Sequence, residues 1–276
     1  MQTTPMKLKR FTGLILGVIL PVIGLSACVM QSPQAIAAPT QTNAEQNRYL
    51  RAAQYSEANE GRAMVVVKSG QLVFEHYAPG VDPERRRFLA SGTKSFSCAI
   101  ALLGVQDGLL TLDEPVANTI IGWRLHPQKS QSPSANCSTS PAASGVEKVE
   151  TPTYAEAIRE ALTAEPGERY QYGPIPFQIF GEVMRRKLVA RGMAESPLTY
   201  LDSRILQPIG LKYDRDLWTH QNELPNLPSG ARISAREWAK YGVLILNQGQ
   251  WQGQQLLDSR LLNQCFQGTA KTLLMG

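Results

Sequence analysis

The chain has few of the residues from which metal centres and nucleic-acid interfaces are built. Its three histidines, His76, His126 and His220, show no ligand spacing, and no cluster of cysteine, histidine and carboxylate residues accompanies them. Basic residues form no patch interleaved with aromatic side chains, and the formal net charge is only +5. We therefore expect neither a metal site nor a nucleic-acid partner.

Cysteine is scarce as well. The four cysteines are Cys28, Cys98, Cys137 and Cys265, and their spacing matches no disulfide framework. Cys98 lies in a strongly apolar stretch, so we expect it to act as a small core residue. Export from the cytoplasm would permit a disulfide, but the spacing itself does not indicate one.

A membrane-spanning helix needs about 20 consecutive apolar residues, and no apolar run of this chain is that long. The apolar segment at residues 11–25 is interrupted by Pro21 and follows the positive residues Lys7, Lys9 and Arg10. A short apolar segment behind a positive N-terminus is typical of a secretory signal. The sequence therefore predicts that the protein is exported.

Two cleavage sites follow this segment. Leu25-Ser26-Ala27-Cys28 resembles a bacterial lipobox, in which Cys28 would carry the lipid and residues 1–28 would form the signal peptide. Ala35-Ile36-Ala37 fits ordinary signal cleavage instead, and an uncleaved membrane anchor is a third alternative. All three place the domain outside the cytoplasm, in the periplasm or held to the membrane of a bacterium by a lipid anchor.

The remaining chain divides into a short polar stretch and one domain. Residues 29–50 are small and polar and predict a flexible tether, which leaves residues 51–276 for the domain. Met64–Lys68 and Gln71–Tyr77 predict two strands of a hairpin that turns at Ser69-Gly70. The stretch TKSFSCAIALLGVQ, residues 93–106, is apolar nearly all round a helical wheel and predicts a buried helix. Further helices are predicted over residues 153–164, 177–191 and 197–206 and after Ser234, with capping boxes at Thr153/Glu156 and Ser234/Glu237.

Ser91-Gly92-Thr93-Lys94 stands at the start of the predicted buried helix. Residues three apart share one face of a helix, so the Ser91 hydroxyl and the Lys94 amine would meet. A serine hydroxyl needs a base to act as a nucleophile. An apolar setting disfavours the ammonium form of lysine, which would free the amine of Lys94 to take the proton. The helix N-terminus would also stabilise a developing oxyanion.

Several segments around this motif resemble one enzyme family. They are, in chain order, the motif after a hairpin, then DGLLTLDEPV at residues 107–116, PGERYQY at 166–172, RILQPIGLKY at 204–213 and GARISAREWAKYGVLILNQGQW at 230–251. Together they resemble the serine β-lactamase and penicillin-binding superfamily, most closely its class C-type and esterase branch. The resemblance implies an α/β (α+β) fold in which an antiparallel sheet is flanked by helices, with a helical insertion. It implies no organic cofactor.

The resemblance also implies roles for three residues. Ser91 would be the nucleophile, Lys94 its general base, and Tyr172 would shuttle protons to the leaving group and from the attacking water. The family commonly has Tyr-x-Asn where this chain has Tyr172-Gly173-Pro174, and proline cannot give the hydrogen bonds of asparagine. This departure favours an esterase, amidase or D,D-peptidase over a true β-lactamase.

The implied partner is a small-molecule or peptide substrate, with the bacterial cell wall as a further partner. A second hypothesis is a catalytically silent relative, either a cell-wall-binding lipoprotein or a decayed gene product. Labelling of Ser91 by an acylating probe would distinguish the two hypotheses.

Two stretches depart from the family pattern in a way that suggests shifted reading frames. SPSANCSTSPAA at residues 132–143 is rich in serine and proline, yet one permitted coding read in the adjacent frame gives ITIRQLLNLTSG, as the family would have it. Lys271-Thr272-Leu273 lacks the glycine of the family's third motif. We therefore expect an aberrant loop at residues 132–150, missing C-terminal strands, and weak or absent activity of the literal chain. A natural Ser/Pro-rich loop is the alternative.

Overall fold

The computed structural model describes residues 42–132, 151–160, 172–219 and 223–266. The predicted signal peptide with Cys28, the final residues 267–276 and all but the first residue of the predicted aberrant loop lie outside these ranges. Every element below belongs to a single unit of the chain, residues 40–276. Among the described residues, no helix combines the length and the apolar character that crossing a bilayer requires.

Helix α1, Asn43–Ala58, corrects the predicted tether, because residues 43–50 are helical rather than flexible. The Thr42 side chain caps the helix by accepting a hydrogen bond from the Glu45 N–H. The helix has no broad apolar stripe, which is why its sequence resembled a linker. Its side chains are tied to the following hairpin by polar contacts: Glu45 accepts from Lys68 at 2.6 Å and Glu57 lies 2.7 Å from His76.

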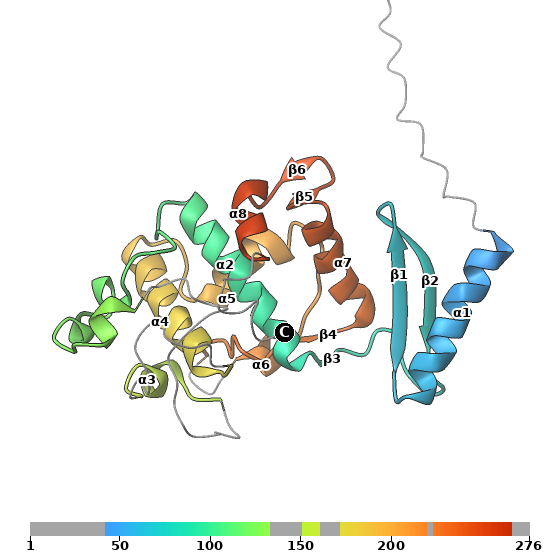
Figure 1. Cartoon of the computed structure of the whole chain (residues 1–276), viewed down its shortest axis with the longest axis horizontal. Helices are drawn as coiled ribbons and strands as arrows, with labels where there is room; N and C mark the ends of the chain where they lie inside the picture. The colour runs from blue at the N-terminus through green and yellow to red at the C-terminus, as the bar shows by residue number, and fades with distance from the viewer. Residues whose placement is uncertain (1–41, 133–150, 161–171, 220–222, 267–276) are drawn as a thin grey trace, which may run out of the picture. The chain divides into compact units, whose positions relative to one another are not determined.

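Strands β1, Ala63–Lys68, and β2, Gln71–Tyr77, form the predicted antiparallel hairpin. Helix α1 lies beside this hairpin and contacts both strands (Figure 1). The turn falls at Ser69-Gly70, as predicted, and both residues have positive φ. Strand β1 of the hairpin also contacts helix α7, Ala235–Leu246. Arg236 of that helix donates two hydrogen bonds to Glu75, at 2.6 and 2.7 Å, and one to Glu84.

The predicted buried helix is present as α2, Ser95–Gln106, preceded by a 3₁₀ turn over Ala90–Lys94. Strand β3, Arg87–Phe88, leads into this turn and pairs antiparallel with β4, Arg232–Ile233. Helix α2 is enclosed on nearly every face, as its sequence predicted. Its fully buried residues include Phe96, Ala99, Ile100, Leu102 and Leu103.

The helices predicted over residues 177–191 and 197–206 are present with altered bounds, whereas α6 and α8 were not predicted. The described elements are α3, Tyr154–Ala157; α4, Ile175–Ala190; α5, Pro197–Leu201, followed by a π-helical turn at Asp202–Leu206; α6, Arg215–Trp218; β5, Gln250–Trp251; β6, Gln254–Gln255; and α8, Ser259–Gln264. Short 3₁₀ turns occur at Val116–Asn118, Ile121–Trp123 and Lys129–Gln131. Helix α3 ends earlier than predicted, and residues 161–171 lie outside the description.

The two predicted capping boxes have different outcomes. Thr153 and Glu156 form a complete box, with both reciprocal hydrogen bonds. Ser234 caps α7 by accepting from Glu237 N–H, but the Glu237 carboxylate accepts from Lys212 N–H at 2.7 Å instead of reaching back. The second box is therefore only half confirmed, because Glu237 joins α7 to the segment before α6.

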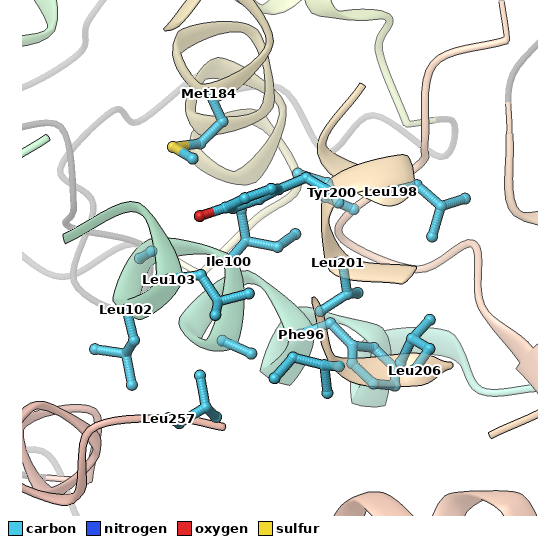
Figure 2. Packing of buried hydrophobic residues seen from close by; sticks show 14 of the residues in the cluster. Phe96, Ile100, Leu102, Leu103, Met184, Leu198, Tyr200, Leu201, Leu206 and Leu257 are labelled. Carbon is cyan, nitrogen blue, oxygen red and sulfur yellow. The ribbon is translucent and has the colours of Figure 1, made fainter. Parts of the chain in front are cut away.

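The main core forms around α2. Figure 2 shows Phe96, Ile100, Leu102 and Leu103 of α2 against Met184 of α4, Leu198, Tyr200 and Leu201 of α5, and Leu206 and Leu257. A second, smaller cluster joins the 3₁₀ turns at residues 116–123 to α3 and α4 through side chains that include Trp123, Ala157, Ile179 and Val183. Helix α4 takes part in both clusters, so it connects the two halves of the packed interior.

Cys98 and Cys265 form a disulfide, with their Cα atoms 6.3 Å apart. Cys98 packs against the core, as predicted, but it also forms a bond that the sequence did not indicate. The bond links α2 to the residue after α8 across 167 positions of sequence. A pair so distant belongs to no short-range spacing pattern, which explains why the sequence did not reveal it.

The buried position of α2 predicts a sharp difference between two leucines. Leu102 is 0% exposed and Leu125 is 95% exposed. Leu102→Ala should lower the free energy of unfolding by about 2–5 kcal/mol, because it leaves a cavity, whereas Leu125→Ala should change it by less than about 0.5 kcal/mol. Urea denaturation measures both. Equal destabilisation by the two substitutions would contradict the burial of α2.

Candidate active site

The turn that carries Ser91 is fixed by backbone and side-chain hydrogen bonds to the segment before β4. Leu89 N–H donates to the Ala231 carbonyl at 2.8 Å. Thr93, fully buried, donates through Oγ1 to the Ala90 carbonyl at 2.7 Å and accepts from Ala231 N–H at 3.1 Å. Ala90 has φ +49°, a left-handed conformation that costs a non-glycine residue energy. The surrounding hydrogen bonds hold Ala90 there, and Ser91 follows directly, exposed to solvent.

Lys94 lies one helical turn beyond Ser91, as the motif spacing predicted. Its Nζ donates to Ser91 Oγ at 3.2 Å and to the Pro228 carbonyl at 2.9 Å. The first contact is short enough for proton transfer between the hydroxyl and the amine. The second fixes the direction of the amine relative to the backbone of another segment.

Tyr172 completes the group of three predicted residues. Lys94 Nζ lies 4.8 Å from the centre of the Tyr172 ring and 5.4 Å from that of Phe177. A hydrogen bond with Ser91 is the largest cause that lowers the pKa of the Tyr172 phenol, and the charge of Lys94 lowers it further, while partial burial opposes both. The structure therefore brings Ser91, Lys94 and Tyr172 together, and the catalytic role of each stays a prediction.

The backbone carbonyl of Pro228 is a site component that sequence reasoning missed. It belongs to a loop in which Asn226 N–H donates to the Trp218 carbonyl and Gly230 N–H donates to the Asn226 carbonyl. A Cβ at Gly230 would lie 2.7 Å from the Trp218 carbonyl oxygen, so the loop depends on glycine there. A carbonyl acceptor has no residue signature, because every residue type has one.

The hydrogen bonds of Lys94 also bear on the departure at Pro174. Pro174 has no side-chain donor or acceptor, so Lys94 has no hydrogen bond of the kind that the asparagine of the family would give. The structure gives the amine two other partners, Ser91 Oγ and the Pro228 carbonyl. Within the described residues, no group of three His, Cys, Asp or Glu side chains is arranged to hold a metal ion.

Comparison with known proteins identifies the family. The model of the family described as Beta-lactamase matches residues 47–214, more than half of the chain. The chain belongs to the β-lactamase family. This confirms the resemblance inferred from the motifs, and it places Ser91, Lys94 and Tyr172 inside the matched region. A search of curated proteins gave no significant match.

Solved structures confirm the β-lactamase-like fold of mixed helices and antiparallel strands. A Bacillus anthracis protein described as a 6-aminohexanoate-dimer hydrolase matches with a TM-score of 0.62 and 20% identity, over 76% of this chain and 60% of that one. A D-stereospecific amidohydrolase from a Streptomyces species matches with a TM-score of 0.62 and 17% identity, over 78% of this chain and 76% of that one. The D-amino acid amidase of Ochrobactrum anthropi SV3 matches with a TM-score of 0.59 and 17% identity, over 78% of this chain and 72% of that one.

The chain thus spans less than two thirds of the Bacillus anthracis structure. At these identities the likeness shows the fold, which the β-lactamase family shares with hydrolases named for different amides. The substrate of this chain has to be argued from its own site.

The environment of Tyr172 predicts an unusual titration. Subtracting the ultraviolet phenolate absorbance of Tyr172→Phe from that of the wild type should isolate one tyrosine that ionises below the usual pKa of about 10. Ser91→Ala should move this midpoint upward, because it removes the largest cause of the shift. Tyr241→Phe is the control, since burial raises the pKa of that phenol and its removal should leave the low step unchanged. A Tyr172 midpoint at or above the usual value would contradict the geometry.

Proposed function

We propose that the protein is an exported serine hydrolase that cleaves an ester or amide through an acyl-Ser91 intermediate. The observation that carries the proposal is the 3.2 Å contact between Lys94 Nζ and Ser91 Oγ. The Tyr172 phenol interacts with both residues. In this mechanism Ser91 Oγ attacks the substrate carbonyl while the neutral amine of Lys94 takes its proton. Tyr172 then passes the proton from Lys94 to the leaving group. In the second half of the reaction Tyr172 takes a proton from the attacking water, and a proton returns to Ser91 Oγ as its bond to the acyl carbon breaks.

The substrate class in this proposal is a small amide or ester rather than a penicillin. Two structural neighbours are named as a D-amino acid amidase and a D-stereospecific amidohydrolase, which favours amide substrates. Pro174 offers no side-chain hydrogen bond to a substrate amide, which disfavours recognition of a penicillin side chain. A cell-wall peptide is the second candidate, because one neighbour is named as a penicillin-binding protein homologue.

Export and lipidation at Cys28 form the second part of the proposal. The positive N-terminus, the apolar segment and the lipobox-like sequence support it. The disulfide between Cys98 and Cys265 is independent support, since such bonds form and persist in oxidising compartments. In this proposal the hydrolase domain works in the periplasm, held to the membrane by the lipid on Cys28.

Labelling of the purified full chain with a fluorescent fluorophosphonate tests the enzyme hypothesis. The probe needs only one transfer to Ser91, so we expect one labelled serine in the wild type even where turnover of a substrate is weak. Ser91→Ala should not be labelled, whereas Ser95→Ala, which removes the exposed hydroxyl one turn further along the helix, should be. Circular dichroism establishes that each variant is folded. A folded wild type that stays unlabelled would favour the alternative, a catalytically silent member of the family.

A further inference from the structure

Gln178 is a fully buried polar residue of α4 whose side chain joins two other segments of the chain. Its Nε2 donates to the Pro152 carbonyl at 2.6 Å. Its Oε1 accepts from Leu227 N–H at 3.3 Å. A buried amide is costly unless it is hydrogen-bonded, and the contacts of Gln178 lead to two segments outside α4.

One of these segments reaches Lys94 through the residue that follows Leu227. The carbonyl of Pro228 accepts from Lys94 Nζ at 2.9 Å, and Ala231 N–H, three residues further on, donates to Thr93 Oγ1 at 3.1 Å. The segment from Leu227 to Ala231 is therefore held at both ends by side chains that are 0% exposed. Gln178 fixes one end, Thr93 fixes the other, and the carbonyl that meets Lys94 lies between them.

We infer that Gln178 is a positioning residue for the base, acting on Lys94 through Leu227 and Pro228. The inference rests on the proposed acyl-Ser91 mechanism. A neutral lysine amine has two N–H bonds and one lone pair. In the structure Nζ donates both to Ser91 Oγ and to the Pro228 carbonyl. When the amine has lost its proton and keeps the N–H that it donates to Pro228, its lone pair can take the direction of Ser91 and accept from Oγ–H. The proton then passes from Oγ to Nζ as the bond from Oγ to the substrate carbonyl carbon forms.

This arrangement gives Gln178 an effect on chemistry without any contact with substrate. A shift of about 1 Å in a catalytic group can cost roughly a hundredfold in rate. If the Leu227 N–H loses its acceptor, the Pro228 carbonyl is released from α4 and the Lys94 amine loses its fixed direction. Loss of the Gln178 side chain therefore slows the acylation of Ser91. The binding of a probe that touches neither Gln178 nor Leu227 is unaffected.

The test compares two substitutions in α4 of the full chain. Gln178→Met keeps a long, unbranched side chain but removes the hydrogen bonds to Pro152 and Leu227. Val183→Ala removes buried volume from the same helix away from the Leu227–Ala231 segment. With a fluorophosphonate probe, we expect Gln178→Met to lower the limiting rate of Ser91 labelling roughly ten- to a hundredfold at unchanged half-saturating probe concentration. Val183→Ala should lower the melting temperature yet label at the wild-type rate.

Gln178→Glu provides a second measurement, which remains informative if Gln178→Met folds poorly. A neutral carboxyl can accept from Leu227 N–H and donate to the Pro152 carbonyl. A carboxylate has no proton to donate, so the oxygen that faces the Pro152 carbonyl oxygen is repelled, and the side chain is displaced from its place against Leu227 N–H. We therefore expect the ratio of the Gln178→Glu rate to the wild-type rate to fall as pH rises through the pKa of the introduced carboxyl.

The outcomes separate this inference from the proposed function. Labelled wild type together with a wild-type rate for Gln178→Met, or a pH-independent ratio for Gln178→Glu, overturns the role of Gln178 and leaves the acyl-Ser91 mechanism standing. A folded wild type that is not labelled at Ser91 overturns both.

Discussion

The burial of helix α2 on nearly all its faces is the constraint on which the rest of the structure depends. A helix without a polar face has to be enclosed, and α4, α5 and the segment around Leu257 supply the apolar surfaces that enclose it (Figure 2). Enclosure fixes the position and direction of the helix. The 3₁₀ turn at its start is consequently presented at the edge of the core, with Ser91 exposed and Lys94 half-buried.

Polar contacts then assemble the site around this fixed turn. Thr93 joins the turn to Ala231, the Pro228 carbonyl meets Lys94, and the Tyr172 phenol lies against Ser91 and Lys94. These groups come from three segments that are far apart in sequence. Buried Thr93 and Gln178 anchor two of these segments, so that part of the site is preorganised by packing. Tyr172 lies shortly before α4, whose residues are largely buried.

The parts of this arrangement that depend on local periodicity could be predicted from the sequence. The nearly all-round apolar pattern of residues 93–106 predicted the helix, and the i, i+3 spacing of Ser91 and Lys94 predicted the contact. The hairpin turn at Ser69-Gly70 also follows from local residue preferences. Tyr172 lies outside any local pattern, and only its resemblance to the β-lactamase family suggested that it would join Ser91.

Tertiary contacts account for what the sequence did not reveal. Residues 43–50 form part of α1 because ion pairs and the hairpin stabilise a polar helix that resembles a tether. Cys98 and Cys265 meet only because α2 and α8 pack together. The Pro228 carbonyl and the Gln178 side chain matter through their positions, and neither belongs to a motif.

Intact-protein mass spectrometry during turnover of a p-nitrophenyl ester tests the central claim most directly. Acid quenching of the full chain should reveal a mass increase equal to one acyl group, located by proteolysis on the peptide that contains Ser91. Neither the adduct nor the nitrophenol burst should occur with Ser91→Ala. Nitrophenol release that is undiminished by Ser91→Ala, or a folded wild type that never carries the acyl group, would contradict the account.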